Sequence, residues 1–350
     1  MCLALVSLAL GQSALEASPV DLETRSGLEG LADITSDVQV FGIGESIHAS
    51  TGLEAARFAA TEFALAELGF TAVAIELSWL EARRVDAALQ RCADGAGLED
   101  LNLESNDLWD KAWQGAYRPL LERLCERNRT HPPIHVFGID ITDTWNSRDL
   151  LEVGAADTTL REHCLGTRFN SQKELVEWGQ ANNRPPPTKQ NQRSCLRHLK
   201  TLQRGELTDD QTLALQSIRA NQRSVWSLHV QRDIKSAYNF REDGMADAFR
   251  AERKRLNNPR TLLLGHDNHV ARSNQLYHPI GARLSEDLTY ANLSVDGLQV
   301  ETRMGAQFDP PSPEPASVQA QWATINGPVV LILHPGERHD GTLYLDYAER

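Results

Sequence analysis

Short apolar runs alternate along the chain with longer stretches of helical periodicity. The apolar runs lie at residues 38–43, 71–77, 134–140, 261–267 and 328–334. Their hydrophobicity is nearly continuous, which is typical of strands that are buried on both faces of a parallel sheet. The alternation of such strands with helices predicts an α/β fold, in which a parallel-rich central sheet is flanked by helices.

The clearest helix pattern follows the first apolar run. From residue 51 onward, apolar side chains recur at helical spacing, and Gly69 is expected to end the helix. Thr51 and Glu54 have the spacing of a capping box, which predicts Thr51 as the capping residue. A second helix is predicted over residues 79–92, directly after the second strand.

Residues 146–258 contain almost no strand pattern. Stretches at 148–155, 172–180 and 210–240 have helical spacing, and an irregular Pro-rich linker separates the last two. We therefore expect one domain over residues 19–350, with a large helical insertion at 146–258 that forms a wall or lid of a cleft. The simpler alternative is that these helices cover the sheet.

The first 18 residues resemble a secretory signal peptide, because a short apolar core is followed by small residues. The basic residues that normally precede such a core are missing, so an amphipathic first helix is the alternative. Removal of this segment leaves four cysteines, whose spacing within each pair suits two disulfides in an oxidising compartment. The pairing is left open for Cys92, Cys125, Cys164 and Cys195. We expect a secreted or periplasmic protein, with a cytoplasmic location as the alternative.

The charge balance limits the classes of partner. The 350 residues carry a formal net charge of -13, which argues against nucleic-acid binding. The chain contains no apolar run long enough to span a membrane. The expected partner is a small molecule, and the sequence does not indicate an oligomeric state.

Acidic and imidazole side chains follow four of the predicted strands. In open parallel sheets, ligands bind beyond the carboxyl ends of the strands, where the loops converge. Each residue alone has a simpler interpretation as a helix-capping, turn or packing residue, but four strand ends together predict a site. The residues, in chain order, are Glu45, His48, Glu76, Asp140, His266 and His269. Arg57, in the helix after His48, is expected to reach back toward Glu45 and Glu76 and to keep them ionised.

Several of these residues lie in motifs that resemble the erythromycin esterase-like family. The motifs are GESIH at 44–48 with Arg57, GFTAVAIE at 69–76, FGID at 137–140, REDGMA at 241–246, GHDNHVAR at 265–272 and DGTLYLDYAE at 340–349. The family includes macrolide-lactone hydrolases and proteins labelled as succinoglycan biosynthesis proteins. The resemblance runs from about residue 28 to the end, and it implies the α/β fold and a hydrolytic site.

The chain departs from the family pattern at three positions. Ala49 stands where the family usually has glycine, Asp267 where it has asparagine, and Glu242 where it has aspartate. None of these changes removes a proposed catalytic group. Asp140, Asp267 and Arg272 are predicted to bind the substrate or to support the site.

The leading hypothesis is a metal-independent esterase or lactonase that needs no cofactor. The resemblance implies that His48 acts as the general base on water. Glu45 and Glu76 would orient His48 or the water, and Arg57 would position carboxylates or the developing oxyanion. His266 and His269 would stabilise the tetrahedral intermediate or protonate the leaving alkoxide.

Three alternatives stay open at this point. The same histidines and glutamates form a ligand set for zinc or manganese, which would give a metal-dependent hydrolase. Ser46, Asp140 and His266 follow the chain order of a serine-hydrolase triad, although His48 replaces the second glycine of the usual motif. The last alternative is a non-enzymatic protein that binds a ligand or assists biosynthesis.

Overall fold

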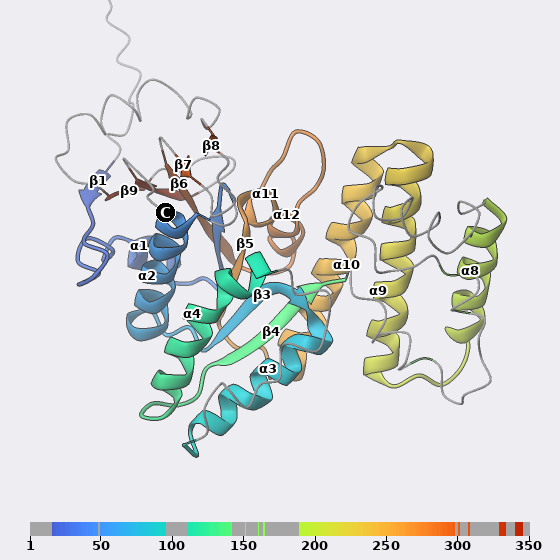
Figure 1. Ribbon diagram of the computed structural model, residues 1–350, viewed down its shortest axis with the longest axis horizontal. Coiled ribbons are helices and arrows are strands. Elements are labelled where there is room, and N and C mark those ends of the chain that lie inside the picture. The colour runs from blue at the N-terminus through green and yellow to red at the C-terminus, as the bar shows by residue number, and fades with distance from the viewer. Residues whose placement is uncertain are drawn as a thin grey trace, which may run out of the picture.

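The computed structural model describes residues 16–47, 50–95, 111–141, 151, 160, 164, 189–297, 300–301, 307–308, 329–333 and 340–345. Its centre is an eight-stranded sheet (Figure 1). In spatial order the strands are β1 (Glu16–Pro19), β9 (Val329–Leu333), β10 (Gly341–Leu345), β6 (Tyr290–Gly297), β2 (Val40–Glu45), β5 (Thr261–His266), β3 (Ala72–Ser78) and β4 (His135–Asp140). A separate two-stranded sheet pairs β7 (Val300–Glu301) with β8 (Gln307–Phe308).

The strands from β10 to β4 are all parallel to their neighbours, so the parallel-rich sheet predicted from the sequence is confirmed. β9 is the exception, because it pairs antiparallel with both β1 and β10. Only a short connection joins β9 to β10, and a short connection cannot carry the crossover that parallel neighbours need. The fifth predicted strand therefore exists, but its direction is opposite to that of the other predicted strands.

Helices cover both faces of the sheet. On one face, α2 (Thr51–Glu67), α3 (Trp79–Cys92) and α4 (Lys111–Asn128) pack on alternate strand residues such as Ile43, Ile75 and Leu264. On the other face, α10 (Ile234–Arg255) and α12 (Ile280–Leu284) pack on Ala74 and Leu263. The burial of alternate residues on opposite faces explains why the strands are apolar at nearly every position.

The end of α10 belongs to this second layer, where Phe249 packs edge-on against Phe137 of β4 at 5.4 Å between ring centroids. The other described helices of the 146–258 region are α8 (Lys189–Leu202) and α9 (Asp209–Trp226). Figure 1 shows them beyond α10, at the end of the molecule farthest from β1. The π-helix η3 (Ser227–Gln231) joins α9 to α10, and the chain turns at Arg232, whose φ is 60°.

Local features of the fold can be compared with the sequence prediction: the cap of α2, β6 and β1 differ from it, and Gly69 agrees with it. The cap of α2 is Ser50 rather than Thr51, since the Ser50 side chain accepts from the backbone N–H of Leu53. Gly69 follows the end of α2 with a φ of 73°, as expected of a residue that ends a helix. β6 was not predicted, because buried polar residues interrupt its apolar pattern, among them Asn292. β1 lies partly inside the segment 1–18 that resembles a signal peptide.

Two disulfides each attach a helix to another segment of the chain. Cys92 at the end of α3 is bonded to Cys125 of α4, and Cys164 is bonded to Cys195 of α8. Each bond therefore joins two successive cysteines of the chain, which are 33 and 31 residues apart.

Residues 1–15 and the predicted helix at 172–180 lie outside the described residues, as does most of the stretch at 148–155. The short helix α1 (Leu31–Thr35) precedes β2, and α11 (Asp267–Val270) follows β5. No helix within the described ranges is both long and apolar enough to cross a bilayer.

Candidate functional site

Glu76 is the central residue of a polar cluster at the carboxyl end of the sheet. It lies near the end of β3 and is buried, with 7% of its surface exposed. One carboxylate oxygen is 2.8 Å from Nη2 of Arg241 and 3.4 Å from Nε2 of His269. The other accepts from the backbone N–H of His266 at 3.4 Å. Glu76 therefore connects β3, β5, α10 and α11.

His269 lies between two carboxylates. Its Nδ1 is 2.6 Å from Oε1 of Glu242, while its Nε2 faces Glu76. Burial alone would lower the pKa of His269, but the negative charges of Glu242 and Glu76 outweigh it and raise the pKa to about 10. The ring is therefore an imidazolium at neutral pH, and it can donate protons or hydrogen bonds but cannot act as a base.

Arg241 brings a further carboxylate into the cluster. Its Nη2 is 3.4 Å from Asp140 at the end of β4, in addition to its contact with Glu76. Burial opposes the charge on the guanidinium, but Asp140, Glu76 and Glu242 raise the pKa of Arg241 above its ordinary value. The Nη1 atom of Arg241 is 3.3 Å from Nε2 of His269. This close approach of two cations is compensated by Glu76, which contacts both.

Glu45 and Arg57 form a second buried group on the α2 face of the sheet. Glu45 ends β2 and Arg57 is completely buried in α2, with 3.1 Å between Nη1 of Arg57 and Oε1 of Glu45. The guanidinium also lies over the ring of Tyr117 at 5.3 Å. Burial disfavours the charge, but Glu45, Tyr117 and Glu54 together raise the pKa of Arg57 above its ordinary value. Arg57 is therefore a permanent cation, and it pairs with Glu45, whereas Arg241 pairs with Glu76.

His266 lies between the two groups. It is the register partner of Glu45 in the parallel pair β2–β5, so these two residues end adjacent strands at the same level. Nδ1 of His266 accepts from the backbone N–H of Asn268 at 3.0 Å. Because an accepting nitrogen carries no proton, the proton of the neutral ring is on Nε2.

The loop after β5 packs closely on β2. A Cβ at Gly44 would lie 2.4 Å from a Val270 methyl carbon and 2.7 Å from the Cα of Asp267. Glycine is therefore required for α11 to approach β2, and this approach places His266 and His269 beside the ends of β2 and β3. Ala49, which stands where the family usually has a second glycine, lies outside the described residues.

The predicted supporting residues surround this loop. Asp267 begins α11 and is buried. Arg272 pairs with Asp340 at 2.7 Å, and Asp340 also accepts from the backbone N–H of Asn292. Arg272 thus ties the loop to the start of β10. Asp140 contacts Arg241, as described above.

The structure leaves one predicted residue out. His48 lies outside the described residues, so its proposed role as the base stays a prediction. Its neighbour Ser46 donates to Asp296 at the end of β6, at 2.8 Å. The carboxylate beside Ser46 is thus Asp296, whereas Asp140 contacts Arg241.

Sequence reasoning missed two residues of the cluster. Arg241 and Glu242 lie inside α10, where no strand end or loop signals chemistry. The stretch REDGMA was noted only as part of the family resemblance. Their role becomes visible in the tertiary structure, where Glu242 is completely buried and, like most buried acids, is paired.

The described residues contain no group of three or more His, Cys, Asp or Glu side chains arranged to hold a metal ion. His48 was part of the ligand set considered for zinc or manganese, and it lies outside the described residues. The prediction that no cofactor is needed therefore stays a prediction.

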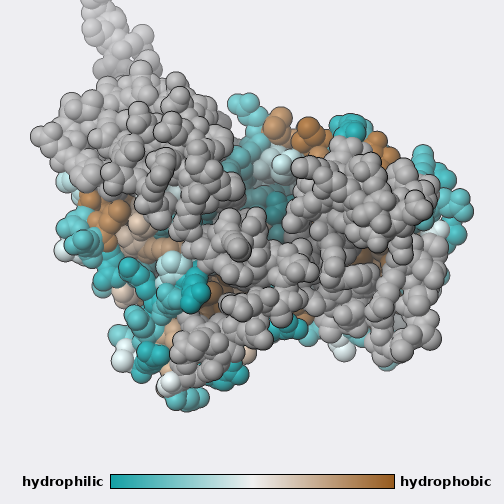
Figure 2. Space-filling view, in the orientation of Figure 1, coloured by the Kyte–Doolittle hydropathy of each residue, from teal (hydrophilic) through white to brown (hydrophobic). Residues whose placement is uncertain are grey.

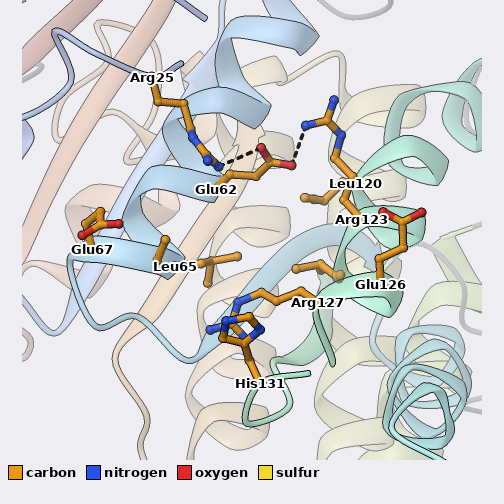
Figure 3. A pocket seen from close by; sticks show the side chains of 11 residues that line it. Arg25, Glu62, Leu65, Glu67, Leu120, Arg123, Glu126, Arg127 and His131 are labelled. Atoms are coloured by element: carbon orange, nitrogen blue, oxygen red, sulfur yellow. Dashed lines mark hydrogen bonds and ion pairs between the residues drawn. The ribbon is translucent and has the colours of Figure 1, made fainter. Parts of the chain in front are cut away.

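A separate pocket of about 670 Å³ lies between α2 and α4 (Figure 3). Leu65, Leu120 and Leu124 contribute its apolar lining. On its rim, Glu62 bridges Arg25 at 3.2 Å and Arg123 at 2.7 Å. None of the predicted site residues lines this pocket, and the bridged charges on its rim fit a structural contact between the two helices.

The fold and the buried histidine–carboxylate cluster together define an α/β protein with a polar site at the carboxyl edge of its sheet. The family model described as erythromycin esterase matches residues 65–302. The chain therefore belongs to the erythromycin esterase family, which supports an esterase-like hydrolase. The matched range includes Glu76, Arg241 and both histidines after β5, but not the segment that holds Glu45 and Arg57.

Solved structures share the fold at low sequence identity. A histidine-to-asparagine mutant of the erythromycin esterase EreC, in its open conformation, is 15% identical with a TM-score of 0.72, over 96% of this chain and 99% of that one. A Bacillus cereus protein is 14% identical with a TM-score of 0.65, over 94% of both chains. A succinoglycan biosynthesis protein is 16% identical with a TM-score of 0.60, over the same shares. No curated protein matches the chain.

Proposed function

We propose that the protein hydrolyses a carboxylic ester or lactone with a water molecule that His48 activates. The observation that carries this proposal is the position of Glu76, which contacts Arg241, His269 and the backbone of His266 at one edge of the sheet. Cations and hydrogen-bond donors from separate elements thus surround one buried carboxylate. Ester hydrolysis needs such donors where negative charge develops in the transition state.

The two described histidines have different proposed roles. His269 has a pKa of about 10, which is too high for efficient proton transfer at neutral pH but suits electrostatic stabilisation of an oxyanion. His266 carries its proton on Nε2, because Nδ1 accepts from Asn268. We assign the Nε2–H of His266 to a hydrogen bond that stabilises the leaving alkoxide. His48 is the base that takes a proton from water, and its imidazolium then gives that proton to the leaving oxygen.

Arg57 has a positioning role in this proposal. It is fully buried between Glu45, 3.1 Å away, and the ring of Tyr117. Such a guanidinium can hold the Glu45 side chain in place and donate toward the reacting water or oxyanion.

The hydrolysis is proposed to need no metal ion. Both ring nitrogens of His269 face carboxylates, at 3.4 Å from Glu76 and 2.6 Å from Glu242, so each is already engaged in an ion pair. Glu76 is likewise engaged by Arg241. These contacts support acid–base chemistry over the metal-dependent alternative.

The test is a hydrolysis screen of lactones and activated esters, with and without a chelator. We expect the wild type to release acid in both conditions and His48→Asn to lose about 10²- to 10⁴-fold in kcat/KM. His278→Asn serves as the control, since His278 is an exposed histidine near the surface of the same region. Equal activity of His48→Asn and wild type would exclude His48 as the base. Activity that disappears with chelator and returns with zinc or manganese would favour the metal-dependent alternative. A complete lack of turnover would favour a ligand-binding protein.

We also propose that the protein is exported. The two disulfides support an oxidising compartment. β1 begins at Glu16, so cleavage after residue 18 would remove most of that strand, and a mature chain that starts near residue 16 would keep it. Fractionation of expressing cells and mass analysis of the mature N-terminus test the location. A cytoplasmic protein with free thiols would contradict it.

A further inference from the structure

Large hydrophobic side chains that are exposed in the described residues gather beside the polar cluster. They are Val230, Ile234, Tyr238 and Leu276, with 43%, 54%, 37% and 63% of their surface exposed. They come from η3, from the first turns of α10 and from the loop that follows α11. Figure 2 shows hydrophobic residues along the upper edge of the molecule, over this part of the fold. Single exposed hydrophobic residues are ordinary, but a group of them marks a binding surface.

Two tyrosines form the centre of this surface. The rings of Tyr238 and Tyr277 are stacked with their centroids 4.8 Å apart and their planes at 11°. Tyr277 is buried under the stack, whereas Tyr238 keeps a third of its surface exposed. Ile234 is one helical turn before Tyr238 on the same side of α10, and Leu276 precedes Tyr277 in the loop.

Hydrogen bonds hold the loop against α10. The side chain of Asn239 accepts from the backbone N–H of His278 at 2.9 Å, and Glu242 accepts from that of Ile280 at 2.7 Å. The surface is therefore organised before any ligand binds, which reduces the entropic cost of binding.

The stacked pair connects directly to the histidine segment. The hydroxyl of Tyr277 donates to the backbone oxygen of Asn268 at 3.4 Å, and Asn268 lies between His266 and His269 in the chain. Burial raises the pKa of Tyr277, and the nearby charge of Glu242 raises it further. The apolar surface therefore begins immediately beside the histidines.

We propose that Ile234, Tyr238, Leu276 and Tyr277 form an apolar shelf that binds the alcohol portion of the substrate. The proposal rests on the proposed function, in which His266 donates a hydrogen bond to the leaving alkoxide. The shelf continues from the segment that carries this histidine, so the alcohol side of the ester lies over it. A bulky apolar alcohol, such as an aryl or alicyclic group that stacks on Tyr238, is the ligand class that fits.

The kinetic test compares two acetate esters that differ only in the alcohol, ethyl acetate and 2-naphthylmethyl acetate. In Tyr238→Ser with Leu276→Ser, we expect kcat/KM for the naphthylmethyl ester to fall about tenfold through a higher KM, with ethyl acetate unchanged. Tyr238→Phe keeps the stacked ring and should behave as wild type. Equal rates for wild type and the double variant on the naphthylmethyl ester, or an equal loss on both esters, would overturn the shelf.

A binding measurement separates the shelf from catalysis. Calorimetric titration with N-(2-naphthylmethyl)acetamide, the amide analogue, should show about tenfold weaker binding to the double variant than to wild type. If neither ester is hydrolysed, the proposed function fails, and this titration alone decides whether the shelf binds the group. Circular dichroism and the melting temperature check that the variant is folded. A change from dimer to monomer in the variant, with unchanged binding, would assign the surface to a subunit interface and reject the proposal.

Discussion

The pair of Glu242 and His269 allows a quantitative prediction about stability. Glu242 is completely buried in α10, and its two oxygens are used by His269 Nδ1 and the backbone N–H of Ile280. Glu242→Gln keeps an oxygen that can accept from Ile280 but removes the negative charge beside the ring. The substitution therefore keeps the volume of the side chain while removing both the charge and the acceptor that faces Nδ1 of His269.

The size of the effect follows from the pKa of His269. In the folded protein it is about 10, against the ordinary value of 6.5. A group with a raised pKa stabilises the fold fully below its unfolded pKa, and this contribution is lost as the pH rises through the folded pKa. Since each pKa unit corresponds to about 1.4 kcal/mol, protonation of His269 stabilises the fold by roughly 4 kcal/mol at pH 7. The contribution is nearly absent above pH 10.

In Glu242→Gln, Glu76 is the carboxylate that remains against the ring. We expect the variant to lose about half of this contribution, or roughly 2 kcal/mol at pH 7. The difference between variant and wild type should be at its full value at and below pH 6.5 and should shrink toward pH 10. Apart from the substituted Glu242, the titrating groups are common to both proteins.

The assay is urea unfolding at a series of pH values from 6 to 10, followed by circular dichroism. Glu242→Asp restores the charge and the family residue, so it should recover part of the pH dependence. Glu286→Gln, at an exposed acid, should leave the curve unchanged. A stability difference that is constant from pH 6 to 10 would refute the reasoning, because a loss of packing alone does not depend on pH.

Three further predictions concern the site, the packing and the disulfides. Arg241→Lys should lower kcat at least tenfold on an ester that the wild type hydrolyses, because an ammonium cannot bridge Glu76 and Asp140 as the guanidinium does. An unchanged kcat in the variant would show that the bridge is dispensable. Gly44→Ala should destabilise the fold by about 1–3 kcal/mol in urea unfolding, since its Cβ would clash with α11. Gly205→Ala is the control and should cost far less, because a Cβ there makes an ordinary contact. Similar losses for both variants would contradict the packing account. Replacement of Cys92 and Cys125 by serine should lower the free energy of unfolding by about 2–4 kcal/mol in the same assay; an unchanged value would mean that the bond is not formed.

The strands and most of the candidate site could be read from local patterns. An apolar run that is buried on both faces has the same appearance wherever its neighbours lie, so β2, β3, β4 and β5 were predictable. Parallel strands also end at one edge of their sheet, which is why Glu76 and His269 could be expected to meet. β6 could not be predicted from an apolar run, because it contains a buried polar residue. The side chain of Asn292 is buried and donates a hydrogen bond to the backbone oxygen of Val270.

The partners of the charged residues depend on the tertiary structure. Arg57 and Arg241 are both arginines in helices, and the chain does not indicate which carboxylate each one meets. The side of the sheet decides it, because Glu45 faces α2 and Glu76 faces α10. A shift of one residue in either strand would turn the carboxylate of that strand to the opposite face of the sheet.

The amino-acid sequence by itself determined the class of fold, the level in the sheet at which the chemistry is placed and the family, because these depend on periodicity and on residue type. Only the tertiary structure decided that His269 lies between Glu242 and Glu76 and is therefore charged, and that Tyr238 stacks on Tyr277 beside it. The physical reason is that pKa values and ring stacking depend on distances of a few ångströms between residues that are far apart in the chain.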